Sequence, residues 1–214
     1  QNGVSRLLHV SALHANTNGT SAYLRSKGEG EKIIIESNLE MTVFRPSVIF
    51  GPGDSFLNLF ANLIQRLPVL PLGSPNAKFQ PVFIGDVAEV IIESLSAPDT
   101  FGQSYNLCGP KVYSLRQIVE YVSAITKYKL SIIELSDWLS YLQAMCLEFL
   151  PGKIMTRDNY LSMKTDSVCD CNNENDLMKV FGIQPTELEE VAPLYLVSDS
   201  PRGRYMGFRD RAGR

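Results

Sequence analysis

The sequence predicts an α/β protein with a doubly wound, largely parallel sheet. Between residues 7 and 135, apolar segments of strand length alternate with segments of helical periodicity, the pattern of strands joined by crossover helices. Residues 7–13 are apolar almost without interruption, as in a strand that is covered on both faces. The 214 residues, of which 44% are hydrophobic and 20% charged, suffice for one good core or for one domain with a small appendage.

The individual elements follow from periodicity and from proline and glycine positions. We expect strands at residues 7–13, 41–45, 80–84, 104–108 and 130–135. We expect helices at residues 22–37, 56–67, 87–96, 115–126 and 137–150, followed by helical segments at 173–181 and 187–197. Residues 46–54 hold two prolines and two glycines and are predicted to be a loop. Asp86, Ser114 and Thr186 are predicted N-caps, because their side-chain oxygens can accept unpaired backbone N–H groups.

A candidate catalytic set stands at the start of the chain. Ser11 lies at the end of the first predicted strand, and Tyr23 and Lys27 share one face of the following helix because they are four residues apart. A lysine ammonium beside a tyrosine favours the phenolate and lowers the tyrosine pKa, so Tyr23 can exchange a proton with a substrate oxygen. Ser11 can hydrogen-bond the same oxygen at the carboxyl end of the strand, where open α/β sheets bind ligands.

Other candidate residues receive structural interpretations. Tyr160 and Lys164 repeat the Tyr-x-x-x-Lys spacing without a strand and serine before them, and we interpret that pair as chance. His14 is interpreted as a polar loop residue. The cysteines at 108, 146, 169 and 171 show no disulfide framework, and no metal site is expected.

Charge and hydropathy limit the partners and the cellular compartment that we expect for the chain. The net charge of −3 gives no indication of nucleic-acid binding. The basic tail at 198–214 is interpreted as a frayed end, with a docking segment for an acidic partner or anionic lipid as the alternative. No signal peptide or membrane span is evident, so a reducing, cytoplasmic compartment is the default, with peripheral association at the inner face of a membrane as a further possibility.

Beyond these residues, several motifs carry a family resemblance. The segments Phe44–Asp54, Gln80–Ala88 and Tyr105–Pro110 resemble the extended and atypical short-chain dehydrogenases, the NAD-dependent epimerase/dehydratase superfamily. That resemblance implies a partial Rossmann-like sheet, a cofactor that is NAD or NADP, and catalytic roles for Ser11, Tyr23 and Lys27. It also implies that Tyr23, Lys27, Pro46, Ser47 and Val48 contact the cofactor near its nicotinamide.

A narrower resemblance extends to about residue 195. Tyr23–Lys27, Thr156–Asp158 and Gly182–Glu189 resemble the NADPH-binding accessory subunit of respiratory complex I and its bacterial relatives. The expected domains are a dinucleotide-binding part at 1–110, interleaved with substrate-side residues 54–80, and a smaller α/β-to-helical substrate or docking region at 111–197.

The family's glycine-rich βαβ unit has no counterpart in the sequence. A G-x-x-G-x-x-G turn would let backbone approach the cofactor pyrophosphate at a helix N-terminus, and no such turn occurs. We therefore expect the chain to be the C-terminal portion of a longer protein, with an exposed sheet edge and apolar surface. By itself we expect it to bind NAD(P) negligibly and to have no activity.

Two functions follow from the resemblance. The first is an NAD(P)-dependent oxidoreductase, or a sugar epimerase or dehydratase relative, acting on an unidentified small molecule. The alternative is a non-catalytic NAD(P)H-binding accessory subunit of a respiratory NADH:quinone oxidoreductase, docked through the apolar helix at 137–150 or self-associated through exposed apolar surface. A hydride-transfer assay of the parent separates these two functions.

Overall fold

A parallel three-stranded sheet forms one half of the molecule. The computed structural model describes residues 4–37, 39–149, 154–169 and 177–197. Strands β1 (Arg6–Val10), β2 (Glu40–Pro46) and β7 (Gln103–Leu107) pair in the order β1-β2-β7, with Val10 opposite Phe44 and Phe44 opposite Tyr105. The predicted α/β class with a parallel sheet is confirmed, although the first strand ends at Val10 rather than at residue 13.

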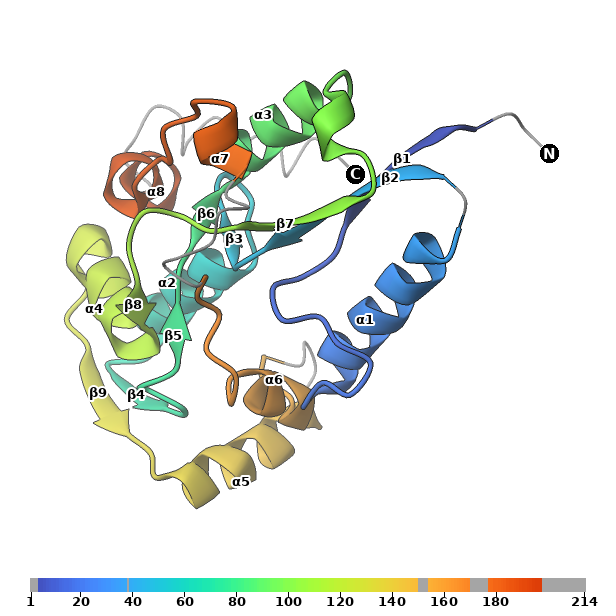
Figure 1. Cartoon of the computed structure of the whole chain (residues 1–214). Helices are drawn as coiled ribbons and strands as arrows, with labels where there is room; N and C mark the ends of the chain where they lie inside the picture. Colours follow the sequence, from blue (N-terminus) through green and yellow to red (C-terminus); the bar gives the residue numbers. More distant parts are fainter. Residues whose placement is uncertain (1–3, 38, 150–153, 170–176, 198–214) are drawn as a thin grey trace, which may run out of the picture.

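Helices cover both faces of this sheet. Figure 1 shows α1 (Ala22–Ile35) on one side and α3 (Ile84–Ser94) with α7 (Leu177–Val180) on the other. Side chains alternate accordingly, because successive strand residues point to opposite faces. Arg45 of β2 meets α1, whereas Phe44 belongs to an apolar cluster with Val87 and Val90 of α3. Residues 98–100 form a short 3₁₀ helix, η1 (Pro98–Thr100), before β7.

The other half of the molecule is built around α2 (Phe56–Arg66) and α4 (Leu115–Thr126). Its largest apolar cluster joins α2 and α4 with α8 (Leu188–Leu196) and includes Leu57, Ile118 and Leu188. Three short strand pairs border this core: parallel β3 (Ile49–Phe50) with β6 (Val82–Phe83), parallel β4 (Val69–Leu72) with β9 (Ser131–Glu134), and antiparallel β5 (Lys78–Phe79) with β8 (Tyr113–Ser114). Helices α5 (Asp137–Glu148) and α6 (Arg157–Ser162) pack on each other beside β4.

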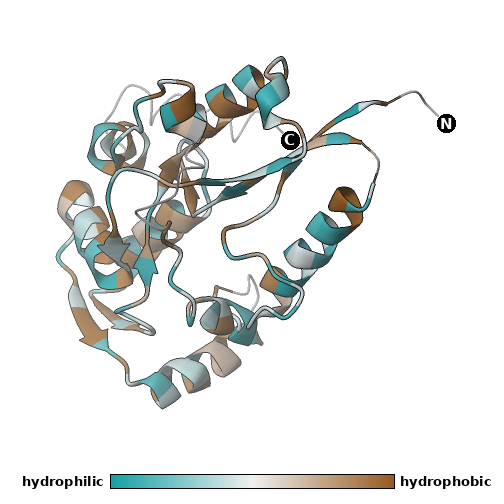
Figure 2. Ribbon diagram, in the orientation of Figure 1, coloured by the Kyte–Doolittle hydropathy of each residue, from teal (hydrophilic) through white to brown (hydrophobic). Residues whose placement is uncertain are grey.

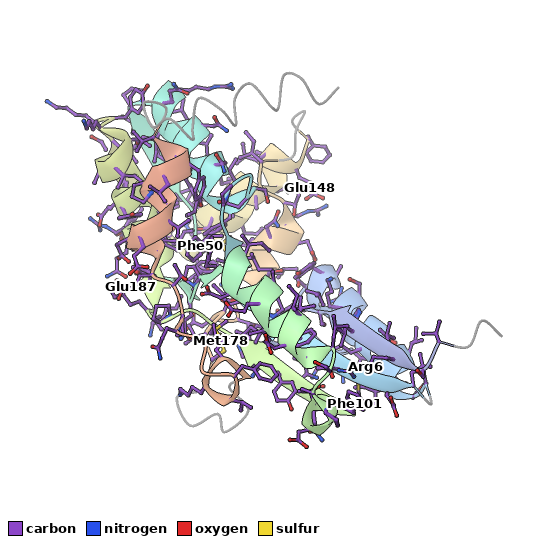
Figure 3. The ribbon with its side chains drawn as sticks, turned by 90° about the horizontal axis from the view of Figure 1, so that it is seen from above. Arg6, Phe50, Phe101, Glu148, Met178 and Glu187 are labelled. Atoms are coloured by element: carbon purple, nitrogen blue, oxygen red, sulfur yellow. A yellow bond between two sulfur atoms is a disulfide. The ribbon has the colours of Figure 1, made fainter. Side chains whose placement is uncertain are left out.

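One end of the sheet is closed by Arg6. Its guanidinium donates to the Thr42 hydroxyl at 2.8 Å and to the Ser94 carbonyl oxygen at 2.8 Å. It also stacks 4.0 Å over the Phe101 ring, and Figure 3 shows these two side chains together at that end. These contacts join β1 to the segment between α3 and β7.

Two features of this half leave surface exposed: the β1 edge of the described sheet and the last turn of α1. Among the described strands, β1 pairs with β2 alone. Figure 2 colours the last turn of α1 as hydrophobic, and Ile33 and Ile35 there are 69% and 49% exposed. None of the described helices combines the length and apolarity needed to cross a bilayer.

Two predicted caps are wrong, and one is confirmed. Phe83, not Asp86, is the N-cap of α3, and the Asp86 carboxylate instead accepts hydrogen bonds from the Thr186 backbone and hydroxyl at 2.7 and 2.8 Å. The Thr186 hydroxyl donates to Asp86 and therefore does not cap α8, whose N-cap is Glu187. Ser114 does cap α4, in a capping box with Gln117. The predicted tail at 198–214 lies outside the described residues.

Candidate functional site

The N-terminus of α1 is fixed from two directions, and this places Tyr23. The Ser21 hydroxyl caps the helix by accepting from the Leu24 backbone N–H at 3.1 Å. The Asp158 carboxylate, on α6, accepts from the backbone N–H groups of Ala22 and Tyr23 at 2.6 and 3.0 Å. A negative charge at this end is also favourable to the helix dipole. Tyr23 therefore stands on the first turn of a firmly held helix, with 48% of its surface exposed.

Ser11 and Lys27 lie at the carboxyl end of β1. The Ser11 backbone N–H donates to the Phe44 carbonyl oxygen at 2.7 Å, and the Ser11 hydroxyl is buried without a hydrogen-bond partner among the described residues. Lys27 Nζ donates to the Val10 carbonyl oxygen at 3.4 Å. An unpaired buried hydroxyl is uncommon in folded proteins, and it leaves Ser11 able to hydrogen-bond a ligand at this strand end.

The electrostatic setting of Tyr23 differs from the sequence-based expectation. Burial raises the pKa of the Tyr23 hydroxyl above its ordinary value, whereas the neighbouring lysine was expected to lower it. The Lys27 ammonium is turned toward Val10, which accounts for the missing effect. In this arrangement Tyr23 is a protonated hydroxyl near neutral pH and therefore a proton donor.

A buried ion pair and a close helix contact hold α1 in place. Arg45 donates to both oxygens of the Glu31 carboxylate, with distances of 2.5 to 3.0 Å, and Glu31 is only 3% exposed. At Gly28, an added Cβ would lie 2.3 Å from the carbonyl carbon of Asn16. Only glycine permits this approach of α1 to the loop that follows Ser11.

The loop after β2 faces Tyr23 and is tied to the segment around Ser167. The Ser47 backbone N–H donates to the Leu107 carbonyl oxygen at 2.9 Å, while the Ser47 hydroxyl donates to the Ser167 carbonyl oxygen at 2.7 Å. The hydroxyls of these two serines are 2.9 Å apart. The Val48 carbonyl oxygen accepts from Val82 at 3.0 Å. Ser47 is thus held by two separate segments of the chain, and Val48 by a third.

A disulfide also anchors this segment, contrary to the prediction. Cys108, just after β7, is bonded to Cys169, with Cα atoms 6.2 Å apart. The sequence interpretation found no disulfide framework because the two cysteines are 61 residues apart and belong to no spaced motif. Cys146 is free and exposed, and Cys171 lies outside the described residues. Cys169 is therefore committed to the disulfide, and no group of metal-ligating side chains occurs in the described part of the chain.

A cavity of about 820 Å³ brings four of the six predicted site residues together. Tyr23, Pro46, Ser47 and Val48 line it, and Ser11 and Lys27 do not. We call Tyr23, Ser47 and Ser167 its polar wall. Its apolar wall comes from α2, β4 and α5, which lie across from α1 in Figure 1, and consists of Leu59, Leu63, Leu67, Leu70 and Leu147. This volume lies within the range of about 300–1,000 Å³ that is typical of small-molecule sites.

Sequence analysis missed Asp158 and Ser167 as site residues. Thr156 caps α6 through a box with Asn159, a local signal that could have located this helix. No local signal announces that Asp158 then reaches the start of α1, 136 residues away from Ala22. His14 also lines the cavity, and its ring nitrogen lies 3.3 Å from the Val168 carbonyl oxygen.

The fold and the site together define a class. A parallel α/β sheet with a serine at a strand end, and a tyrosine and lysine on the next helix, is the arrangement of nicotinamide-dependent oxidoreductases of the short-chain dehydrogenase type. The residues present fit the nicotinamide part of such a cofactor, since the Ser11 hydroxyl has no hydrogen-bond partner within the described ranges and the Pro46–Val48 loop opens on the cavity.

Comparisons with known proteins agree with this class. Residues 10–114 match the 3-beta hydroxysteroid dehydrogenase/isomerase family. The chain is 34% identical over 194 residues to NADH dehydrogenase [ubiquinone] 1 alpha subcomplex subunit 9 of Mus musculus mitochondria, covering 87% of this chain and 50% of that protein. It is 27% identical to the mitochondrial NADH-ubiquinone oxidoreductase 40 kDa subunit of Neurospora crassa, covering 91% and 51%. The chain thus spans about half the length of these relatives.

Solved structures share the fold. An NADPH-dependent quinone oxidoreductase of Escherichia coli, solved with NADPH, aligns with a TM-score of 0.69 and 19% identity over 90% of this chain and 66% of that one. A nucleoside-diphosphate-sugar epimerase of Staphylococcus aureus aligns with a TM-score of 0.67 and 17% identity over 88% and 64%. By these matches the chain is similar to the 3-beta hydroxysteroid dehydrogenase/isomerase family over residues 10–114 and to the complex I accessory subunits over most of its length, and it shares the fold of the epimerase and of the quinone oxidoreductase.

Proposed function

We propose that this chain forms the nicotinamide and substrate side of an NAD(P)(H)-dependent oxidoreductase site. The observation that carries this proposal is the meeting of Tyr23 with the Pro46–Val48 loop around one cavity, beside the end of β1. Residues 1–110 would serve the cofactor, with residues 54–80 and 111–197 forming the substrate side. The apolar cluster shared by α2, α4 and α8 supports that division.

The residues then have distinct roles. Tyr23 donates its proton to a substrate carbonyl oxygen, or accepts one from a hydroxyl, and Lys27 becomes a partner of the cofactor ribose and of Tyr23. Ser11 orients the substrate oxygen with its hydroxyl, which no described side chain or backbone group engages. Pro46, Ser47 and Val48 position the nicotinamide, whose hydride is exchanged with the substrate carbon when the cofactor is bound. Asp158 and Glu31 act indirectly, because they hold the helix that carries Tyr23.

The test is Tyr23→Phe in the complete natural protein that contains this sequence. NADPH and NADH oxidation would be followed with ketones, aldehydes and quinones. We expect kcat/KM to fall by about 100-fold or more, since a positioned general acid contributes roughly 10²–10⁴-fold.

Tyr160→Phe is the matched control, because Tyr160 belongs to the other Tyr-x-x-x-Lys pair and is absent from the cavity lining. Equal activity of Tyr23→Phe and the unaltered protein would refute the assignment of Tyr23 as proton donor.

A second candidate function is an NAD(P)H-binding accessory subunit of a respiratory NADH dehydrogenase. The similarity to the mouse and Neurospora subunits favours it. Helix α5 offers a docking surface, as Trp138 and Phe149 at its two ends are 67% and 81% exposed. In this case the protein sits peripherally on a membrane complex. Self-association through the same apolar surface is the competing use.

The two candidates differ in measurable ways. An accessory subunit would co-purify with NADPH or NADH, fail to oxidise it with any substrate offered, and co-migrate with the respiratory complex on native gels. Trp138→Glu would abolish that co-migration while leaving cofactor content unchanged. A protein that turns over substrate and migrates as a free species contradicts this second function.

A further inference from the structure

The substrate pocket has a chemical character that the proposed function leaves open. Among the described residues that line the 820 Å³ cavity, none is a lysine, arginine, aspartate or glutamate. Its polar groups are the side chains of serines, a threonine, a tyrosine, a histidine, an asparagine and a glutamine. A nucleotide sugar carries a diphosphate, and proteins bind such groups with arginine, lysine or helix N-termini. The described part of the lining offers no lysine or arginine for a diphosphate.

The apolar wall instead suits a hydrocarbon. Helix α2 presents Phe56, Leu59, Phe60 and Leu63 to the cavity, one or two turns apart on a single face. Leu70 and Leu72 of β4 point the same way, because alternate strand residues share a face, and both are buried. Leu147 and Ile154 extend the surface from α5 toward α6. Each methylene placed against this wall leaves water, which is the main source of apolar binding energy.

The polar wall provides one hydrogen-bonding place for such a molecule. Tyr23 lines the cavity and retains its proton, so it can donate to a ligand oxygen. The hydroxyls of Ser47 and Ser167 are 2.9 Å apart and bond each other, so they have less capacity to hydrogen-bond a ligand. The cavity therefore combines the polar wall, and a few further uncharged polar side chains such as Gln143 and Asn159, with a longer apolar surface.

We infer that this cavity takes an uncharged, long-chain ketone or secondary alcohol, with its oxygen at Tyr23 and its chain along the apolar wall. This substrate class rests on the proposed oxidoreductase function, although binding can be measured without it. No formal charge on the ligand is compatible with a cavity whose described lining has no opposite charge to offer.

A homologous series tests the inference directly. Hexan-2-one, decan-2-one and tetradecan-2-one would be titrated calorimetrically into the complete protein, without cofactor, alongside UDP-glucose. We expect the dissociation constant to fall by about four-fold for each added methylene until the chain outgrows the cavity. UDP-glucose should not compete. Affinity that is independent of chain length, or tighter binding of UDP-glucose than of decan-2-one, would overturn the inference.

Matched variants locate the bound chain. Leu67 lines the cavity and is 40% exposed, whereas Leu95 at the end of α3 is 56% exposed and lies elsewhere. Leu67→Gln should weaken decan-2-one binding by about five-fold, and Leu95→Gln should leave it unchanged. Leu59→Trp partly fills the cavity and should weaken tetradecan-2-one much more than hexan-2-one. If another segment of the chain occupies this space, all three ketones fail to bind and the inference is wrong.

The outcomes also separate this inference from the proposed function. If the ketones bind but Tyr23→Phe leaves the rate of cofactor oxidation unaltered, the inference of an apolar ligand stands and the catalytic role of Tyr23 is refuted. If the protein turns over a charged or small polar substrate and its activity does not depend on chain length, the oxidoreductase function stands and the inference of an apolar ligand is refuted.

Discussion

The two walls of the cavity are held in different ways. The polar wall depends on a few directional contacts: Asp158 at the start of α1, the Glu31–Arg45 pair, and the hydrogen bonds between Ser47 and Ser167. The apolar wall depends on many interchangeable contacts within the cluster around α2 and α4. A single substitution should therefore disturb the polar wall more than it disturbs the apolar one, since packing tolerates swaps that conserve volume.

The largest effect is expected at the buried ion pair. Glu31→Gln leaves the Arg45 guanidinium without its charge partner, which should reduce the free energy of unfolding by about 3 kcal/mol. This is the lower end of the usual range, because the Arg45 side chain is 30% exposed. Urea unfolding measures the loss. Glu120→Gln removes a pair with Arg116 in which both side chains are 49% exposed, and should change stability by less than about 1 kcal/mol. Equal losses in the two variants would contradict the comparison.

A somewhat smaller effect is expected from a methyl group on α1. Gly28→Ala places a carbon 2.3 Å from the Asn16 backbone and should cost about 2 kcal/mol, because the helix must move away from the loop. Gly30→Ala, two residues along, has nothing within 4 Å of the new carbon and should stabilise the helix by about 1 kcal/mol. Thermal unfolding of both variants gives the test. Stabilisation by both would show that α1 is loosely seated.

The smallest effect is a pH dependence at His9, where β1 meets the helix that carries Tyr23. Burial, and then the nearby Lys27 charge, lower the pKa of His9, while Glu31 raises it. The unfolded chain takes up this proton near pH 6.5 and the folded chain only at lower pH, so the stability that His9 contributes is present above about pH 6.5 and is lost as pH falls toward the folded pKa. His9→Gln should flatten the decline in melting temperature between about pH 7.5 and about pH 5.5, compared with His14→Gln. Identical declines in both variants would exclude His9 as the cause.

The same contrast explains what could be predicted from the sequence. Periodicity and proline or glycine positions predicted α2, α4 and β2 within a residue or two, because the local pattern alone determines these elements. The Tyr23–Lys27 spacing identified the helix of the site, and the structure adds the cavity that Tyr23 shares with Ser47. The assignments of Asp86 and Thr186 failed because both residues satisfy each other across 100 residues instead of capping their own helices. Three further features were missed because they too depend on contacts between residues far apart in the sequence. They are Asp158, Ser167 and the Cys108–Cys169 bond.

The Cys108–Cys169 disulfide makes the stability of the cavity depend on the redox conditions around the protein. The bond closes a loop with a sequence separation of 61 residues, which contains α4, β9, α5 and α6 and therefore Leu147 of the apolar wall. In the chain-entropy description, such a cross-link stabilises the folded protein by roughly 4 kcal/mol because it reduces the conformational entropy of the unfolded chain. Reduction would widen the set of conformations available to the unfolded chain and thereby lower the free energy of unfolding. The stability of the segment that carries Leu147 therefore depends on the thiol–disulfide balance of the compartment.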